Sequence, residues 1–256
     1  MSRSSPVLGV NAVAELFRRG SPQGTLLFAG GNKRVLELVA EAERRGVKIR
    51  RVEAKEVARY GAPQSQPIVF LVSGSPDRRG TLSPDLLSLG EFLERKRDPS
   101  SLTIFLDGVT DPHNIGAIYR VADQFGAEAV GLPGRRSGSI NETVAKTSSG
   151  AVFHVETVQL AGVAEAIRRA KEHGFWIYGA DARGTIPERL RFAGPAILVM
   201  GSEGKGLHRL VRDRCDDLIA IPTWGQVDSL NVSVAAGILV YELRRHLGAP
   251  TPRGTL

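Results

Sequence analysis

From Leu102 to the C-terminus, short apolar runs alternate with longer amphipathic segments, and this alternation constrains the fold more than any other feature of the sequence. Apolar runs separated by helical periodicity predict strands that are joined by crossover helices. The expected strands are Thr103–Leu106, Ala129–Leu132, Phe153–Val155, Trp176–Gly179, Ala196–Met200 and Leu218–Ile221. The expected helices are Ile115–Phe125, Glu142–Thr147, Val163–Glu172, Leu207–Arg214 and Leu230–His246. The sequence therefore predicts an α/β fold with a parallel sheet that helices cover on both faces.

The N-terminal part of the chain predicts a second, smaller α/β unit. The expected elements are helices at Val13–Arg19, Lys33–Arg45 (capped by Asn32) and Lys55–Tyr60, and strands at Thr25–Ala29, Val47–Val52 and Ile68–Val72. Residues 73–100 are rich in glycine and proline and indicate a linker with one short helix over Pro84–Arg95. We therefore expect one domain over residues 1–75, a linker over 76–100 and a second domain over 101–256.

Positive charge is concentrated at the N-terminal end of the chain. Residues 1–60 hold 12 basic and 6 acidic side chains, and so carry most of the net charge of +7. A basic unit joined to a near-neutral body predicts a polyanionic partner, most simply a nucleic acid. The alternative is a solvated basic surface without such a partner.

Composition and missing motifs argue against several classes of protein. The single Cys215 cannot form an internal disulfide, no run of 18 apolar residues occurs, and the polar N-terminus has no signal-peptide core. We therefore expect a soluble, cytoplasmic protein that does not contact a membrane. The five histidines have no metal-ligand spacing, and no dinucleotide fingerprint, Walker A sequence or serine-hydrolase elbow occurs. These absences disfavour zinc, nicotinamide, triphosphate and serine-hydrolase chemistry.

The segment Leu106–Arg120 joins the first expected strand of the large unit to its first helix. We expect Asn114 to cap that helix. On a helical wheel the apolar residues of Ile115–Phe125 form a core face, whereas Gly116 and Arg120 share a different face. A glycine inside a helix costs about 1 kcal/mol relative to alanine. Beside an arginine, that cost makes sense if another molecule approaches the backbone closely. The alternative is a solvated arginine next to an incidental glycine.

The segment Val199–Leu207 is a glycine-rich loop that follows an apolar strand directly. Gly201, Gly204 and Gly206 surround Ser202, Glu203 and Lys205. Ligands bind in open α/β sheets at such loops, at the carboxyl ends of parallel strands. A buried or half-buried Glu203 suits a cationic or hydroxyl-bearing ligand. The alternative is a tight turn with positive backbone dihedral angles.

The segment Ile221–Asn231 leads into a helix, Val232–Leu243, that is apolar on nearly its whole circumference. Asn231 is the expected cap of this helix. A helix that is apolar all round is buried all round. This predicts burial against a partner subunit as well as against the helix's own sheet, and burial within a monomer is the alternative.

Together these segments resemble the SpoU/TrmH family of RNA 2′-O-methyltransferases in the knotted SPOUT superfamily. Asn114–Arg120 is similar to the first motif of the family, Gly201–Leu207 to the second and Ser229–Ala235 to the third. Residues 6–73 are similar to the ribosomal-protein-like substrate-binding domain of the family, through Gly9–Val13 and the order of elements. The chain departs from close relatives at residues 65–67, where it has Ser-Gln-Pro in place of the usual His-Gln-Gly.

The resemblance implies a C-terminal trefoil knot, a homodimer and S-adenosylmethionine as the cofactor, with no metal. The residues that it implies for the cofactor are Met200, Gly201, Ser202, Gly204, Ile221, Pro222, Ser229 and Leu230. It implies Arg120 as the residue that activates the ribose hydroxyl. Because a guanidinium gives up its proton reluctantly, we expect Arg120 to hold a phosphate and to stabilise oxyanion charge. The same resemblance implies that Asn114 orients Arg120 or the ribose, and that Glu203, Ser229 and Asn231 shape the pocket.

The segment Thr110–Asn114 and the unbroken third motif look most like the enzymes that methylate a guanosine of 23S rRNA. A tRNA ribose 2′-O-methyltransferase is the first alternative. A non-catalytic RNA-binding or ribosome-assembly factor with the same fold is the second, and the intact motifs argue against it. A small-molecule enzyme on an ordinary doubly wound sheet is the third, and the missing dinucleotide fingerprint argues against it.

Three further residues have no place in these motifs. Cys215 is expected to be a small core residue. Trp176 and Trp224 could stack on bases, but packing in the core is the favoured interpretation.

Overall fold

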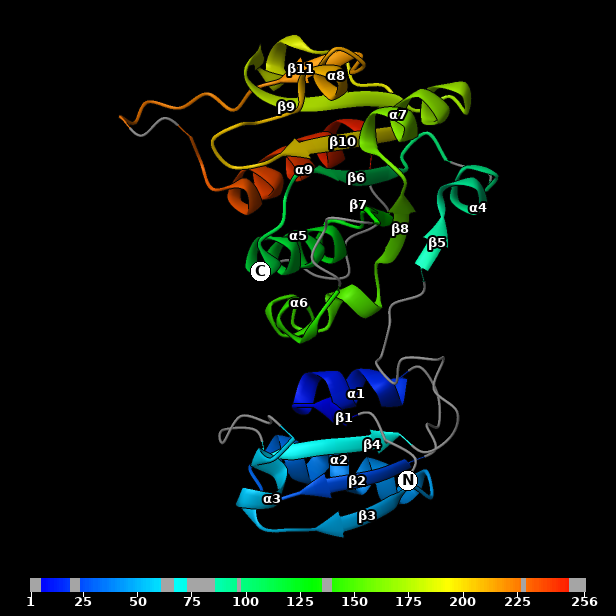
Figure 1. Cartoon of the computed structure of the whole chain (residues 1–256), viewed down its shortest axis with the longest axis vertical. Coiled ribbons are helices and arrows are strands. Elements are labelled where there is room, and N and C mark those ends of the chain that lie inside the picture. The colour runs from blue at the N-terminus through cyan, green and yellow to red at the C-terminus, as the bar shows by residue number, and fades with distance from the viewer. Residues whose placement is uncertain are drawn as a thin grey trace. The chain divides into compact units, whose positions relative to one another are not determined.

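A computed structural model describes residues 6–18, 24–60, 67–72, 86–95, 98–134, 140–226 and 229–248. It divides the chain into two compact units, Met1–Ser83 and Pro84–Leu256, which are described separately here (Figure 1).

The first unit is built on a four-stranded mixed sheet in the order β1-β4-β2-β3. Its strands are β1 (Pro6–Leu8), β2 (Gly24–Phe28), β3 (Lys48–Arg51) and β4 (Ile68–Val72). Strand β4 pairs antiparallel with β1 and β2, and β2 pairs in parallel with β3. The short strand β1 was not expected from the sequence, whereas the other three strands lie where periodicity predicted them.

Helices cover both faces of this small sheet. They are α1 (Val10–Arg18), α2 (Lys33–Arg44) and α3 (Ala54–Ala58). Alternation along the strands separates two cores: Leu26 packs with α1 and α2, whereas its neighbour Leu27 packs with α3. The predicted cap of α2 is confirmed, because the Asn32 side chain accepts a hydrogen bond from the Val35 amide at 3.0 Å.

The second unit holds a seven-stranded, all-parallel sheet in the order β11-β9-β10-β6-β7-β8-β5. Its strands are β5 (Leu86–Ser88), β6 (Leu102–Asp107), β7 (Ala129–Pro133), β8 (Glu156–Leu160), β9 (Trp176–Thr185), β10 (Ala196–Gly201) and β11 (Asp217–Ile219). Every residue of the central strands β6 and β10 is buried. Such continuous burial is what a parallel sheet covered on both faces requires.

Two layers of helices cover the larger sheet (Figure 1). Helices α4 (Leu89–Leu93), α7 (Val163–Glu172) and α8 (Arg209–Arg212) share a core on one face. Helices α5 (Pro112–Gln124), α6 (Glu142–Thr147) and α9 (Val232–Leu247) pack together on the other, with α5 between α6 and α9. The predicted α/β fold is thereby confirmed. Short 3-10 turns, η1 (Ala151–Phe153) and η2 (Pro187–Arg189), complete the elements.

The structure corrects two expectations about this unit. Strand β5 pairs in parallel with β8, and α4 packs in the core, so residues 86–95 belong to the second unit and not to the linker expected over 76–100. The strand expected at Phe153–Val155 is also misplaced, because Phe153 is the last residue of the turn η1 and the strand begins at Glu156.

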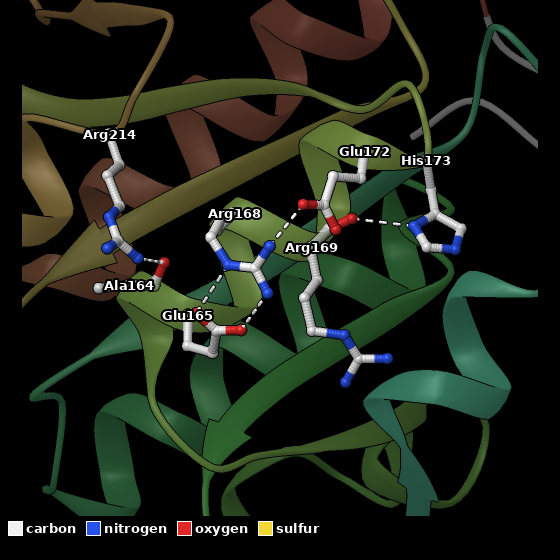
Figure 2. Close-up of polar contacts among 7 residues, drawn as sticks. All are labelled: Ala164, Glu165, Arg168, Arg169, Glu172, His173 and Arg214. Carbon is white, nitrogen blue, oxygen red and sulfur yellow. Dashed lines mark hydrogen bonds and ion pairs between the residues drawn. The ribbon is translucent and has the colours of Figure 1, made fainter.

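Helix α7 has the bounds that the sequence predicts, and ion pairs run along its outer face (Figure 2). Arg168 donates hydrogen bonds to Glu165 and Glu172, which lie one turn before and one turn after it. Arg214, beyond α8, donates to the carbonyl oxygen of Ala164 and so joins the two helices. These exposed pairs support the helix and define a solvated surface.

None of the helices in the described parts of the chain is long and apolar enough to cross a membrane.

Candidate functional site

The glycine-rich loop after β10 closes on itself. Ser202 and Gly206 exchange two backbone hydrogen bonds, with N–O distances of 3.2 and 2.8 Å. Gly204 and Gly206 have φ angles of +77° and +65°, a region that disfavours side chains. The tight turn with positive dihedral angles, weighed from the sequence as an alternative to a ligand loop, is therefore present, and it lies at the carboxyl end of a central strand.

Gly201, the last residue of β10, fits where no larger residue can. A Cβ atom on Gly201 would lie 2.2 Å from the carbonyl carbon of Gly206 and 2.4 Å from the amide nitrogen of Leu207. Both neighbours are backbone atoms, so rotating a side chain cannot relieve the overlap. The closed form of the turn thus depends on glycine at position 201.

Three side chains from distant segments meet in front of this turn. The Asn114 amide donates from Nδ2 to Glu203 Oε1 at 3.0 Å, and Asn231 Nδ2 donates to the same oxygen at 2.6 Å. Asn231 Nδ2 also donates to Asn114 Oδ1 at 3.0 Å, and the Val232 amide reaches Glu203 Oε1 at 3.4 Å. We call Asn114, Glu203 and Asn231 the polar cluster. It joins the three segments that the sequence singled out.

Helix caps position two members of the polar cluster. Asn231 caps α9 as predicted, because its Oδ1 accepts from the Ser233 amide at 3.0 Å. The cap expected at Asn114 is wrong: Asp111 caps α5 and accepts from the His113 amide at 3.0 Å. Because Pro112 starts the helix, Asn114 falls within the first turn, and its side chain is free to reach Glu203.

Glu203 is exposed, which differs from the buried or half-buried carboxylate considered from the sequence. All hydrogen bonds that Glu203 accepts from the described residues end on its Oε1 atom. Its Oε2 atom has no partner among those residues. The polar cluster therefore presents one free carboxylate oxygen beside the turn.

A buried contact that sequence reasoning missed fixes the base of the site. Asp107, the last residue of β6, is only 5% exposed. Its carboxylate accepts from the His208 amide at 2.8 Å and lies 2.9 Å from Nδ1 of the His208 ring. A charged residue at the end of an otherwise buried strand was the available signal. The contact ties the carboxyl end of β6 to the residue that follows the 201–207 loop.

Gly116 and Arg120 have separate roles in α5. A Cβ on Gly116 would lie 1.8 Å from Thr147 Oγ1, so the glycine allows α6 to pack closely. The packing partner is thus a helix of the same chain and not the separate molecule considered from the sequence. Arg120 is exposed, and its guanidinium has no hydrogen-bond or ion-pair partner in the described part of the chain. The described contacts do not include one between Arg120 and the polar cluster.

The residues that the family resemblance implies for the cofactor lie at the end of β10, in the loop that follows it, and in the segment after β11. They differ in how far each residue is exposed to solvent. Met200 and Gly201 are buried, Ser202 and Ile221 are half-buried, and Gly204, Pro222, Ser229 and Leu230 are exposed. Both loops are therefore partly exposed at the edge of the sheet where the carboxyl ends of β10 and β11 lie.

Helix α9 is not buried all round within this chain, which argues against the alternative of complete burial within a monomer. Val234, Ile238 and Tyr241 are 51%, 39% and 49% exposed. Their spacing places them on one face, and we call these three residues the α9 stripe. The opposite face, which includes Ala236, Leu239 and Leu243, is buried.

The three residues that fell outside the motifs, Cys215, Trp176 and Trp224, differ in their burial. Cys215 is half-buried against the core, and burial raises the pKa of its thiol to about 12. Trp176 is 40% exposed and donates from Nε1 to Asp217 Oδ2 at 2.9 Å. Trp224 is 90% exposed, so core packing was the wrong interpretation for it.

Two models of protein families together match most of the chain. Residues 101–241 match the model of the SpoU rRNA Methylase family. Residues 6–77 match the model described as RNA 2′-O ribose methyltransferase substrate binding. The two matches fall in the larger and the smaller unit of the structure, respectively.

Individual relatives and solved structures point to the same family. A 23S rRNA (guanosine-2′-O-)-methyltransferase, RlmB, of Ralstonia nicotianae is 36% identical over 254 residues, which cover 96% of this chain and 97% of the relative. A Staphylococcus haemolyticus protein named for the TrmH family of tRNA/rRNA methyltransferases is 44% identical over 158 residues, 60% of this chain and 64% of the relative. The crystal structure of an AdoMet-bound rRNA methyltransferase from Sinorhizobium meliloti superposes with a TM-score of 0.72 at 25% identity, covering 96% of this chain and 89% of that one.

Proposed function

Since the chain belongs to the SpoU family of RNA 2′-O-ribose methyltransferases, we propose that it methylates the ribose of a guanosine in 23S rRNA, with S-adenosylmethionine as the methyl donor. The polar cluster is the observation that carries this proposal. It links the first, second and third motif segments through Asn114, Glu203 and Asn231, at the sheet edge where ligands bind in such folds.

The loops fit S-adenosylmethionine chemically. Gly201 keeps the backbone of the 201–207 turn closed, and Ile221 and Leu230 offer partly exposed apolar surface. The free oxygen of Glu203 adds negative charge, which suits a cationic ligand. In this proposal the cofactor is held by Met200, Gly201, Ser202, Gly204, Ile221, Pro222, Ser229 and Leu230. When bound, S-adenosylmethionine supplies a methyl group that its sulfonium makes electrophilic.

The protein's own task is to orient the ribose hydroxyl and to stabilise the charge that develops on its oxygen. Arg120 suits this task because its exposed guanidinium has no partner within the described residues, and its planar fork can hold a phosphate with two hydrogen bonds. Arg120 stabilises the developing oxyanion, while a substrate phosphate accepts the proton. Asn114 and Asn231 keep Glu203 in place, and Ser229 lies beside this cluster in the chain.

The enzyme acts as a homodimer in this proposal. The α9 stripe exposes three apolar side chains on a helix whose other face is buried, which is a self-complementary surface for a second copy. Arg120 has no described contact with the polar cluster of its own chain, and a dimer gives it a second cluster to face. The trefoil knot expected of the family belongs to the same proposal. It is supported by the match of residues 101–241 to the SpoU family.

Tritium transfer from labelled S-adenosylmethionine tests the proposed function. We expect wild-type protein to label unmodified, in vitro transcribed 23S rRNA, and the label to survive as a ribose-methylated guanosine after nuclease digestion. The Arg120→Ala protein serves as the inactive control. Label in transcribed tRNA and not in 23S rRNA would favour the tRNA alternative. An absence of S-adenosylmethionine binding by calorimetry would favour the non-catalytic RNA-binding factor.

A further inference from the structure

Trp224 is the most exposed large apolar residue in the described part of the chain. Its side chain is 90% exposed, whereas the other tryptophan, Trp176, is 40% exposed and hydrogen-bonded to Asp217. Trp224 has no ring contact with any described residue. An indole normally contributes a large apolar area to a core or an interface, so leaving it in water forgoes that stabilisation.

The position of Trp224 connects it to the site. It follows Ile221 by three residues, so the two Cα atoms lie within about 11 Å of each other. The chain then returns to Asn231, which is anchored in the polar cluster. In Figure 1 the segment after β11 leaves the body of the unit before the chain reaches α9. Trp224 thus lies on the segment that joins the end of β11 to the polar cluster.

The surroundings of Trp224 favour a flat partner over a second protein surface. Its neighbours Thr223, Gly225 and Gln226 are all exposed and contribute little apolar area. Protein interfaces need a contiguous apolar core, and the α9 stripe offers one elsewhere. An isolated exposed aromatic ring matches instead the way in which unpaired bases stack on proteins that bind single-stranded nucleic acid.

We propose that Trp224 stacks on an unpaired base of the RNA substrate near the methylated nucleotide and so positions the ribose. This role rests on the proposed function. Trp224 is then a positioning residue, because it holds the RNA and does not touch the reacting atoms. Stacking tolerates every base, so Trp224 contributes affinity and placement more than sequence readout.

Steady-state transfer to transcribed 23S rRNA tests this role with four variants. Trp224→Ala is expected to raise KM for the RNA by about 5- to 150-fold, the range that corresponds to loss of one base–aromatic stack. Trp224→Leu, which keeps apolar volume but has no aromatic face, should behave like alanine. Trp224→Phe should remain within about threefold of wild type. Leu210→Ala, which removes a side chain that is 57% exposed on α8, is the matched surface control.

Fluorescence gives a second readout that does not depend on turnover. In a Trp176→Phe protein, Trp224 is the one remaining tryptophan. Its emission should be quenched when the same RNA is added, and an equal volume of buffer without RNA should lower the emission only in proportion to dilution. If wild-type protein transfers no methyl group, the proposed function fails, yet the quenching still reports whether Trp224 meets RNA.

Three outcomes would overturn the stacking role. The first is an unchanged KM together with unquenched emission. The second is a loss of S-adenosylmethionine affinity in Trp224→Ala by calorimetry, which would place the indole on the cofactor. The third is a monomeric Trp224→Ala protein by light scattering when wild type is dimeric, which would place it in a subunit interface.

Discussion

Replacing Gly201 by alanine is expected to weaken binding of S-adenosylmethionine without unfolding the protein. The added Cβ would lie 2.2 Å from Gly206 and 2.4 Å from Leu207 backbone atoms, so the turn must open to admit it. Opening breaks the two hydrogen bonds between Ser202 and Gly206. At about 0.5–1.5 kcal/mol for each bond, the closed turn loses about 1–3 kcal/mol.

If the cofactor binds only to the closed turn, its apparent Kd rises in proportion to the lost population. The loss of 1–3 kcal/mol therefore corresponds to at most about a 5- to 150-fold weaker affinity, measurable by isothermal titration calorimetry. Gly162→Ala is the matched control, because a Cβ there meets nothing within 4 Å and its φ of −174° is extended. Wild-type affinity in Gly201→Ala would refute the reasoning that the closed turn forms the cofactor site.

Arg120→Ala and Arg120→Lys should each lower transfer to 23S rRNA by about 10²- to 10³-fold while calorimetry shows cofactor binding unchanged; near-normal turnover of the lysine variant would contradict the role of the planar guanidinium. Tyr119→Phe should lower the free energy of unfolding in urea by about 1–3 kcal/mol, because the buried Thr157 hydroxyl, 2.6 Å from the Tyr119 oxygen, loses its partner; an unchanged midpoint would show that this hydrogen bond contributes nothing. Burial raises the pKa of the Cys215 thiol to about 12, above the value of about 8.5 in an unfolded chain. The buried thiol therefore stabilises the fold fully below about pH 8.5, and this contribution is lost as pH rises toward 12. Urea unfolding between pH 8.5 and 10.5 should show wild type losing stability relative to Cys215→Ala, and parallel curves for the two proteins would contradict the shift.

Periodicity predicted most of the larger sheet because buried parallel strands are continuous apolar runs. It located β6, β7, β9 and β10 and gave both ends of α7. It missed β5, since a strand of three residues in a glycine- and proline-rich stretch carries no pattern of its own. That strand exists because β8 offers an edge to pair with, which is a tertiary effect.

The site was predictable in outline and not in its contacts. Motif segments at strand ends indicated that Asn114, Glu203 and Asn231 share one edge of the sheet. The hydrogen bonds among them depend on where α5 starts, and the competition between Asp111 and Asn114 for the cap decides that. A charged residue at the end of buried β6 marked Asp107, but its partner His208 lies 101 positions away, so no local pattern could identify that partner.

Burial of single side chains was the least predictable property. Apolarity on every face of α9 predicted burial against its own sheet and a partner subunit, but it could not say which residues face which; the chain itself buries one face and leaves the α9 stripe exposed. Trp224 was expected in the core and lies in solvent, because residue type alone does not say which side of a loop a side chain takes.

Mapping ribose methylation in total RNA from cells that lack this protein or carry it tests the central claim most directly. Protection of the 2′-oxygen from alkaline cleavage locates each methylated ribose. The account predicts one guanosine of 23S rRNA that is methylated with the wild-type protein and unmethylated both in its absence and with Arg120→Ala. Identical ribose methylation in all three strains would contradict the account.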